Sequence, residues 1–280
     1  MVGSINPVVV VPVHEAKTDE LSETSLRHLT RYLGNYRLVL AKPQRLDWSV
    51  PGLDDEVFPN ESFGTLLRYN QFQLLPEFYE RFSQHSHILI YHLDALVFRD
   101  ELTQWCETDY DYIGASWYPD LIRQYTGNPW PFAPVGCGNG GFSLRRVSAF
   151  LRHLKTRKST LRHAGDRLLE GNFDAASRLW RYRKHLTPSD YEEHGMLNED
   201  VYWGVFAPLI DSSFRVATPE VGNRFSFEYD PNFLLKISGG HMPFGCHAWY
   251  RFEDARQFWT PHLLAADDPV TSGMTRPARG

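Results

Sequence analysis

The chain of 280 residues carries 34 acidic and 29 basic side chains, a formal net charge of −5, and 42% of its residues are hydrophobic. This balance is ordinary for a globular protein and excludes a general nucleic-acid binder, which needs broad neutralisation of phosphates. Three cysteines without a Cys-x-x-Cys pair indicate neither a disulfide framework nor a cysteine zinc site. The sequence shows no transmembrane segment and no signal peptide pattern, so we expect a cytoplasmic protein.

The first half of the chain alternates predicted strands and helices. The β-branched run Val8–Val11 predicts a strand buried on both faces, followed by an amphipathic helix at 22–32. A second helix is predicted over 64–82, where Pro76 kinks or divides it. Further strands are predicted at 36–41, 87–91 and 111–115. The alternation predicts an α/β fold with a mostly parallel central sheet flanked by helices and a ligand at the strand ends.

The second half is predicted to be largely helical. Residues 147–185 are rich in Arg, Lys, Leu and His, and 198–209 read as a helix capped by Asn198. The densest basic segment, 178–184, favours a solvated helix face, with contact to an anionic membrane, at its inner face, or to a polyanionic acceptor as the alternative.

His92 and Asp94 stand two residues apart at the end of a predicted strand, so both side chains can point to one side. A carboxylate there can hold a divalent cation that also binds the two phosphates of a nucleotide-sugar. The alternative is that Asp94 caps the following turn and His92 is a partly buried residue without a ligand.

The glycine-rich segment at 136–145 supports two functional interpretations and a structural one. Gly136–Gly140 resembles the glycine turn of S-adenosylmethionine-dependent methyltransferases, which normally follows the first strand of its domain. The longer Gly138–Arg145 fits a turn whose backbone, at Gly140 and Gly141, must come close to a sugar. A glycine-rich hairpin without a ligand is the third interpretation.

Glu199 and Asp200 face about 100° apart on the predicted helix, so they need not share a task. One can be the general base for an incoming hydroxyl while the other hydrogen-bonds the acceptor or an amide. Acids in a first turn are also explained by the helix dipole. Trp203 extends this face as a platform for a sugar, unless it is a core tryptophan.

His247 lies late in the chain, between a Gly-Cys and an Ala-Trp pair. A single histidine is usually structural, but this one follows the other segments in the order that a metal-dependent transferase requires. His241 is a nearby competitor for the same role.

These segments resemble the GT-A glycosyltransferase superfamily, and more closely a little-characterised microbial family of GT-A-like glycosyltransferases. The likeness spans residues 8–252 and is carried by 90–98, 110–117, 138–145, 198–201 and 247–249. It implies one domain over 1–260, with a Rossmann-like nucleotide-sugar-binding half at 1–100, an acceptor and catalytic half at 101–260, and a loose tail at 261–280. It also implies a nucleotide-sugar donor, favoured as UDP-type, a glycan or glycoconjugate acceptor such as a bacterial polysaccharide, and a divalent cation, Mn²⁺ or Mg²⁺.

The same resemblance implies roles for individual residues. Asp94 matches the last acid of the Asp-x-Asp metal motif and His247 matches the late histidine of the metal shell. Asp200 matches the catalytic acid of inverting members, with Glu199 beside it. Donor contacts are predicted from residues near the strand ends and on the preceding helix, namely Pro12, Val13, His14, Glu15, Asn70, His92 and Asp94. Acceptor or sugar contacts are predicted from Trp117, Gly140, Gly141, Trp203 and Trp249.

One position departs from the pattern, because His92 stands where the first acid of Asp-x-Asp is expected. Either His92 or His247 could complete the shell around Asp94, and Mn²⁺ accepts imidazole more readily than Mg²⁺. The leading hypothesis is an inverting hexosyltransferase with Asp200 as the base. A retaining enzyme is its variant, and a methyltransferase or a non-catalytic sugar-binding module is the alternative.

Overall fold

The computed structural model describes residues 4–127, 136–156, 160–182 and 198–265. The end of the predicted helical region at 183–185 and most of the predicted tail, 266–280, lie outside these residues. The first residues of that tail are ordered, because η4 (Thr260–His262) continues directly from helix α14 (Glu253–Trp259).

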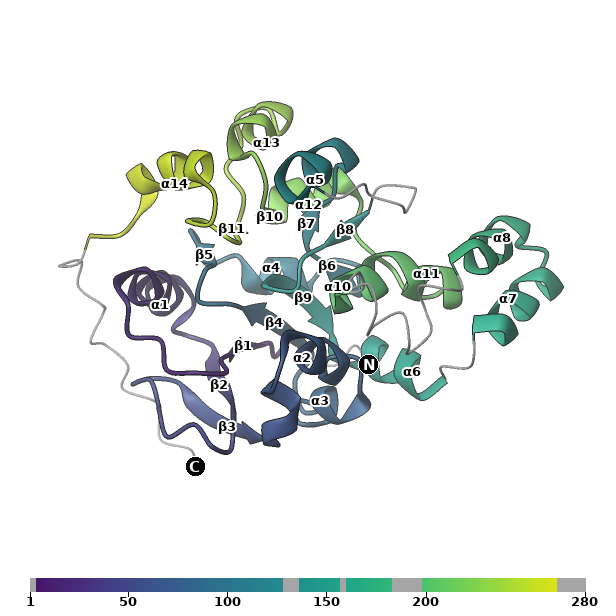
Figure 1. The fold of residues 1–280 in the computed structure, drawn as a ribbon, viewed down its shortest axis with the longest axis horizontal. Helices are drawn as coiled ribbons and strands as arrows, with labels where there is room; N and C mark the ends of the chain where they lie inside the picture. The colour runs from purple at the N-terminus through teal and green to yellow at the C-terminus, as the bar shows by residue number, and fades with distance from the viewer. Residues whose placement is uncertain (1–3, 128–135, 157–159, 183–197, 266–280) are drawn as a thin grey trace.

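A six-stranded sheet in the order β3-β2-β1-β4-β9-β6 forms the centre of the molecule (Figure 1). Its strands are β1 (Val8–Pro12), β2 (Arg37–Pro43), β3 (Asp54–Phe58), β4 (His87–Tyr91), β6 (Tyr112–Ile113) and β9 (Phe142–Arg146). β3, β2, β1 and β4 are parallel, whereas β9 runs antiparallel between β4 and β6. The predicted α/β fold with a largely parallel sheet is confirmed; β3 and β9 were not predicted.

The sheet is buried on both faces, which explains the unbroken apolar run of β1. Val8 and Val10 pack into one core cluster, and Val9 and Val11 pack into another. The first cluster is covered by helices α2 (Leu66–Phe72), α3 (Pro76–Glu80) and α6 (Val147–Thr156). The second is covered by α1 (Glu20–Leu33) and α4 (Leu102–Cys106). Pro76 divides the predicted helix as expected, because it starts α3 at a position where its missing N–H costs nothing.

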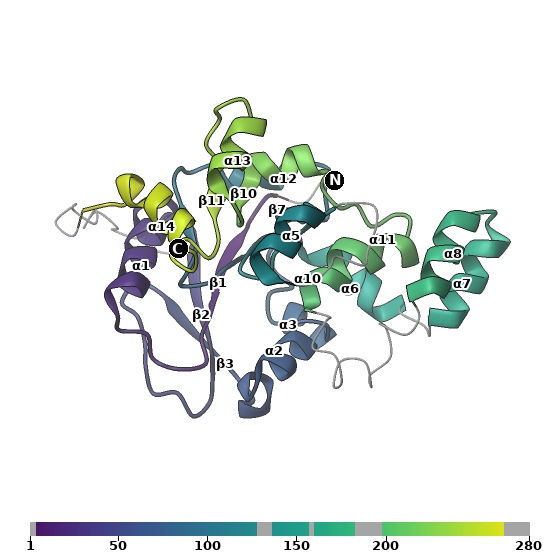
Figure 2. The ribbon, with the colours of Figure 1, turned by 45° about the horizontal axis from the view of Figure 1, so that its top comes forward.

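In the described part of the region predicted to be helical, 147–185, the chain forms three helices. After α6 come α7 (Thr160–Leu169) and α8 (Phe173–Tyr182), which form a hairpin. Figures 1 and 2 show this hairpin at the end of the molecule opposite α1 and α14.

The helix predicted at 198–209 exists, but it is capped differently from expectation. It runs through α10 (Glu199–Val201), a π-helical turn η3 (Tyr202–Phe206) and α11 (Ala207–Ile210). The side chain of Asn198 accepts no hydrogen bond from its own helix. Instead, Asn70 on α2 accepts from the Glu199 N–H at 3.3 Å, so the cap comes from a distant helix.

Two smaller sheets complete the fold, in the orders β10-β11-β5 and β7-β8. Their strands are β5 (Leu96–Val97), β7 (Ala115–Ser116), β8 (Cys137–Gly138), β10 (Ser226–Phe227) and β11 (Gly245–Cys246). The remaining helices are η1 (Asn60–Phe63), α5 (Pro119–Thr126), α12 (Pro219–Phe225) and α13 (Pro231–Ile237). In the part of the chain that the structure describes, no helix combines the length and the apolarity needed to cross a membrane.

Candidate functional site

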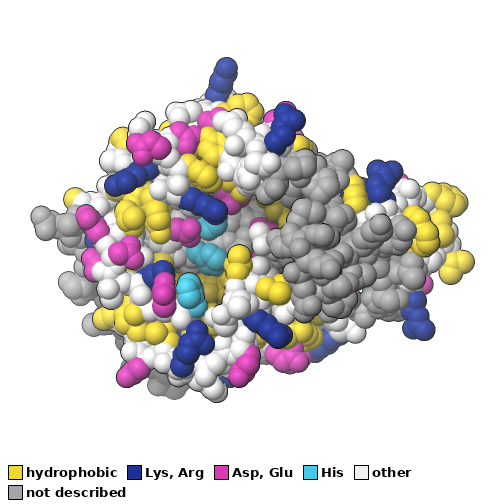
Figure 3. Space-filling view, in the orientation of Figure 1, with side chains coloured by type: hydrophobic (Ala, Val, Ile, Leu, Met, Phe, Trp, Pro, Cys, Tyr) yellow, Lys and Arg dark blue, Asp and Glu magenta, His cyan; other side chains and the backbone are white. Residues whose placement is uncertain are grey.

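The order of the strands marks where a ligand should bind. β1 is flanked by β2 on one side and by β4 on the other, so the chain reverses its direction of winding between β1 and β4. In open α/β sheets the carboxyl ends of two such strands separate and leave a crevice. A cavity of about 530 Å³ lies at this place, and Figure 3 shows histidine side chains in a hollow near the middle of this face.

The cavity is lined by residues that follow β1 and β4 and by residues of the η1–α2 region. These residues are Pro12, Val13, His14, Lys17, Ser22, Phe63, Gly64, Thr65, Leu66, Tyr69, His92, Leu93, Asp94 and Tyr250. Five of the seven residues predicted for the donor therefore share one cavity. Glu15 is outside the lining and pairs with Lys17 at 2.6 Å. Asn70 is also outside it, buried in its capping role.

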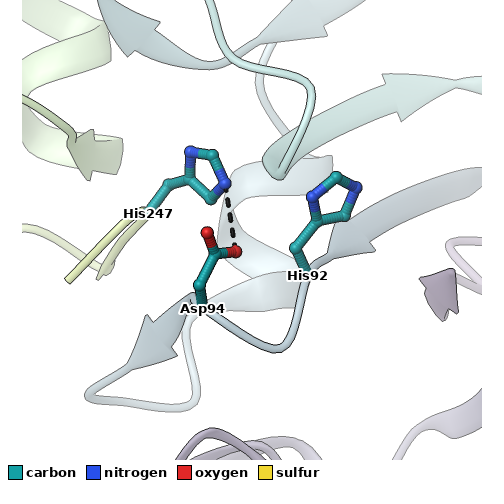
Figure 4. A group of neighbouring side chains, drawn as sticks. All are labelled: His92, Asp94 and His247. Atoms are coloured by element: carbon teal, nitrogen blue, oxygen red, sulfur yellow. Dashed lines mark ion pairs between the residues drawn. The ribbon is translucent and has the colours of Figure 1, made fainter. Parts of the chain in front are cut away.

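Three predicted metal ligands meet at one edge of this cavity. Candidate ligand atoms of His92, Asp94 and His247 all lie within 4.8 Å of one another. His247 Nε2 is 3.2 Å from Asp94 Oδ1 (Figure 4). His92 and Asp94 come from the turn that follows β4, whereas His247 follows β11.

The small sheet brings His247 to Asp94 from the other end of the sequence. In the β11–β5 pairing, Gly245 faces Val97 and Cys246 faces Leu96. His247, the residue that follows β11, therefore approaches the turn before β5. The backbone N–H of Trp249 donates to the Asp94 carbonyl at 3.2 Å and fixes this contact. His241, the competing candidate, is exposed and is not part of the cluster.

His92 has the character of a neutral ligand. Burial lowers the pKa of His92 to about 4, with the neighbouring His247 acting in the same direction. Its Nε2 is 3.2 Å from the hydroxyl of Tyr69, which leaves Nδ1 as the nitrogen available to a cation. In Figure 4 one nitrogen of the ring is on the side of Asp94 and His247.

His247 is held between two carboxylates. Burial alone would lower its pKa, but Asp94 and Glu228 together raise the pKa of His247 to about 10. Glu228 Oε1 contacts the other ring nitrogen, Nδ1, at 3.3 Å. Burial opposes the ionisation of Asp94, yet His247 keeps the pKa of that carboxyl well below its usual range. A divalent cation could replace the proton of His247 here, and one carboxylate with two imidazoles suits Mn²⁺ better than Mg²⁺.

The turn at Asn139–Gly141 joins this cluster to the predicted catalytic acids. The carbonyl of Gly141 accepts from the His92 N–H at 2.8 Å. On the other side, the Gly140 N–H donates to Asp200 Oδ2 at 3.2 Å. Asn139 holds the turn at a φ of 119°, rare for a residue with a side chain, and its Oδ1 accepts from the Gly141 N–H at 2.8 Å.

Both glycines of the turn lie where a side chain would not fit. A Cβ on Gly141 would lie 2.0 Å from His247 Nε2, and one on Gly140 would lie 2.6 Å from Glu199 Oε1. Close packing against the site residues therefore requires these glycines, whether or not a sugar also touches them.

The two neighbouring acids have different environments. Glu199 is buried, and its Oε1 is 2.7 Å from the buried guanidinium of Arg145. Arg145 also donates to Gln73 at 2.8 Å and to Tyr79 at 3.1 Å. Glu199 is therefore the counter-ion of a buried arginine, a contact that the sequence did not predict.

Asp200 is half-buried, and among the described residues it forms no ion pair like that of Glu199 with Arg145. Burial, together with the charges of Glu199 and Glu228, raises the pKa of Asp200 to about 8. Its oxygens accept from the N–H groups of Gly140 and Val201, the latter at 2.7 Å. A carboxylate with a pKa near neutrality, oriented by two backbone amides, has the character of a general base.

The tryptophans predicted to stack on sugars are core residues, and this corrects the prediction. Trp203 is 0% exposed and packs against Phe150, with ring centroids 4.1 Å apart. Trp249 is buried and donates to Ser25. Trp117 is buried too, and a Cβ on Gly138 would lie 1.6 Å from its ring. None of the three has a ring face available to a ligand.

The glycine segment predicted as the alternative methyltransferase turn contributes no residue to the cavity. Gly136, Cys137 and Gly138 instead belong to β8 and its approach, packed against η3 and Trp117. Among the described residues, the surroundings of Gly136 and Gly138 are therefore filled by internal packing.

Several residues of the site were not predicted from the sequence. Tyr69 and Glu228 contact the two histidines, Arg145 neutralises Glu199, and Lys17 and Tyr250 line the cavity. Tyr69 directly precedes the predicted Asn70, but neighbours on a helix face about 100° apart, so its contact with His92 could not be inferred from that position. Glu228 and Arg145 are far in sequence from the residues they contact, whereas Lys17 and Tyr250 lie close to predicted residues but carry no motif of their own.

Comparison with known proteins gives one family and a set of solved structures. A family model described as "Protein of unknown function (DUF5672)" matches residues 53–247. No curated protein matches the chain.

Among the solved structures that are similar is the apo form of the glycosyltransferase GlyE of Streptococcus pneumoniae TIGR4, at 13% identity and a TM-score of 0.45 over 93% of this chain. The chain spans 61% of the length of GlyE. The galactosyltransferase LgtC, in complex with donor and acceptor sugar analogs, is 13% identical with a TM-score of 0.47, covering 93% of this chain and 98% of LgtC. Mouse xyloside xylosyltransferase 1 is 9% identical with a TM-score of 0.45, covering 87% of this chain and 98% of the enzyme.

Proposed function

We propose that this chain, which belongs to the DUF5672 family of proteins of unknown function, is a metal-dependent glycosyltransferase that moves a sugar from a nucleotide-sugar to a hydroxyl acceptor. The observation that carries the proposal is the cluster of His92, Asp94 and His247 at the edge of the crevice between β1 and β4. That crevice is where α/β sheets bind nucleotides, and a divalent cation at its edge suits a diphosphate.

On the donor side, Asp94 and His247 would hold the cation, and His92 would offer a neutral nitrogen to it. When bound, the cation would stabilise the negative charge that a nucleoside diphosphate gains on leaving. Tyr69 orients His92 and Glu228 orients His247, as partners of metal-binding histidines usually do. The cavity between the end of β1 and the aromatic wall of Phe63 and Tyr69 takes the nucleoside of the donor, favoured as the uridine of a UDP-sugar.

On the acceptor side, Asp200 takes the proton from the hydroxyl of a glycan or glycoconjugate. The hydroxyl oxygen then forms the new bond to the anomeric carbon as the bond to the diphosphate breaks on the opposite face, which inverts the configuration. Gly140 and Val201 fix the orientation of the Asp200 carboxylate. Glu199 cannot share this task without abandoning Arg145, so we assign the base to Asp200 alone.

Thermal stabilisation by nucleotides tests the donor side. We expect one nucleoside diphosphate, or its sugar conjugate, to raise the melting temperature in the presence of Mn²⁺ and not in the presence of a chelator. Asp94→Asn should abolish this shift, whereas Asp120→Asn, a change of an exposed acid on α5, should leave it intact. A shift with S-adenosylmethionine alone, or none with any nucleotide, would contradict the proposal.

A non-catalytic sugar-binding module is the second candidate, favoured by the histidine at position 92 in place of an acid. Such a module would bind the nucleotide-sugar without releasing the nucleoside diphosphate. We expect wild-type protein to release it when an acceptor is added, and Asp200→Asn to keep donor binding but lose release. Donor binding without release by the wild type, over a broad panel of acceptors, would favour the module.

A further inference from the structure

The α7–α8 hairpin carries a cluster of exposed apolar side chains at its turn. This cluster, the hairpin tip, consists of Leu168, Leu169 and Phe173, which are 51%, 90% and 70% exposed. Trp180, further along α8, is 56% exposed. Together they are four of the nine large hydrophobic side chains that are exposed among the described residues. Figure 3 shows apolar side chains gathered at this end of the molecule.

The buried face of the hairpin is formed by other side chains than those of the tip. Its inner face is formed by Ala164, Ala175, Leu179 and Tyr182, which are buried in the main core cluster. Phe173 and Trp180 are seven residues apart, so they lie on one outer face of α8. Asn172 accepts from the Ala175 N–H at 3.1 Å and caps α8, which fixes the turn that presents the tip.

The charges around the tip are unevenly balanced. Glu170 pairs with Arg167 at 2.9 Å, and Asp174 pairs with Arg178 at 3.4 Å. Asp166, the third acid of the hairpin, also has a partner. Arg162 and Arg181 are exposed and form no ion pair within the part of the chain that the structure describes. The charges that are left for a partner are therefore both positive.

We propose that the hairpin tip docks onto the surface of a membrane that contains anionic phospholipids. Leu169 and Phe173 enter the boundary of the acyl chains, Trp180 lies at the level of the headgroups, and Arg162 and Arg181 contact lipid phosphates. Exposed apolar residues, an interfacial tryptophan and nearby arginines are the combination that such surfaces bind. This inference does not depend on the proposed function.

The shape of the molecule favours a membrane over a second copy of the chain. The α7–α8 hairpin projects from one end of the molecule in both ribbon views (Figures 1 and 2), and an apolar tip on a projecting hairpin fits an extended, deformable surface. A second copy would have to offer a complementary apolar patch. The other exposed large hydrophobics among the described residues are Val57, Leu66, Leu75, Phe233 and Ile237, which lie on several different elements.

Co-sedimentation of the full chain with lipid vesicles tests the proposal. We expect binding to vesicles of phosphatidylcholine mixed with phosphatidylglycerol, weaker binding to phosphatidylcholine alone, and a fall to that weaker level on the mixed vesicles at high salt. The double change Leu169→Ser and Phe173→Ser should lower the partition coefficient at least about tenfold. Arg162→Gln and Arg181→Gln should each lower it about fivefold on the anionic vesicles only.

Two variants on other elements serve as matched controls. Ile237→Ser removes an exposed apolar side chain from α13, and Arg31→Gln removes an exposed arginine from α1; both should bind like the wild type. Sedimentation of the double serine variant at the wild-type level, or no vesicle binding by the wild type, would overturn the proposal. So would a concentration-dependent dimer, seen by light scattering, that disappears in the double serine variant without any binding to vesicles.

Discussion

Arg145 and Glu199 form a buried ion pair whose energetic coupling can be measured with a double-mutant cycle. Arg145 is 0% exposed, and its guanidinium lies 2.7 Å from Glu199, whose side chain is 3% exposed. Arg145→Met leaves the charge of Glu199 buried without a partner, so we expect a loss of about 3–5 kcal/mol of unfolding free energy. Glu199→Gln keeps the shape of the side chain and leaves the guanidinium uncompensated, and should cost a similar amount.

The double variant should cost less than the sum of the two single losses, because no lone charge remains. We expect a coupling energy of about 2–3 kcal/mol. Urea unfolding followed by tryptophan fluorescence measures all four proteins, since Trp203 packs against Tyr79, a hydrogen-bond partner of Arg145. Single losses that add to within about 0.5 kcal/mol would refute the assignment of Glu199 as a buried counter-ion.

Three further predictions concern the site around this pair. The folded-state pKa of Asp200, about 8, lies above its ordinary value of 3.8, so the protonated carboxyl favours folding and this stabilisation is lost as pH rises through 8. In the presence of a chelator, the melting temperature of Asp200→Asn should therefore rise relative to that of the wild type between about pH 5 and pH 9. A difference in melting temperature that stays constant over this range would contradict the prediction. Gly141→Ala puts a methyl group against His247, which should abolish the Mn²⁺-dependent rise of the melting temperature. The control Gly52→Ala, in open space at a φ of 88°, should lower the melting temperature but keep its Mn²⁺-dependent rise. Glu228→Gln should weaken Mn²⁺ binding about 10–100-fold by calorimetry, and wild-type affinity would remove Glu228 from the support of His247.

The fold was predictable where burial leaves a simple pattern. β1 and β4 are central parallel strands, and their unbroken apolar runs identify them. β3 escaped prediction because it is an edge strand with the sequence Asp-Asp-Glu-Val-Phe, whose half-exposed residues show no apolar alternation. β9 escaped it because Ser143 and Arg145 interrupt its apolar run, and both are buried in a polar network that the sequence does not announce.

The site was predictable only where neighbouring residues carry the chemistry. The pair of His92 and Asp94 is local, and the strand before it fixes where both side chains lie. The contact of Glu228 with His247, by contrast, depends on the pairing of β10 with β11. The capping role of Asn70 was missed for the same reason, because its partner Glu199 is 129 residues away. Composition alone could not separate a buried tryptophan from a sugar platform.

The histidine at position 92 changes the charge balance of the site. Asp94 and Glu228 contribute −2 and the His247 imidazolium +1, a sum of −1, while His92 is neutral. A divalent cation that displaces the His247 proton would bring this sum to −2 + 2 = 0. With a second carboxylate at position 92, the cation-bound site would carry −3 + 2 = −1, and it would repel a diphosphate more strongly. A histidine in place of an acid at position 92 therefore lowers the affinity of the site for the free cation. It raises the affinity for the complex of the cation with a diphosphate, which is the form in which a nucleotide-sugar would bring the cation to the site.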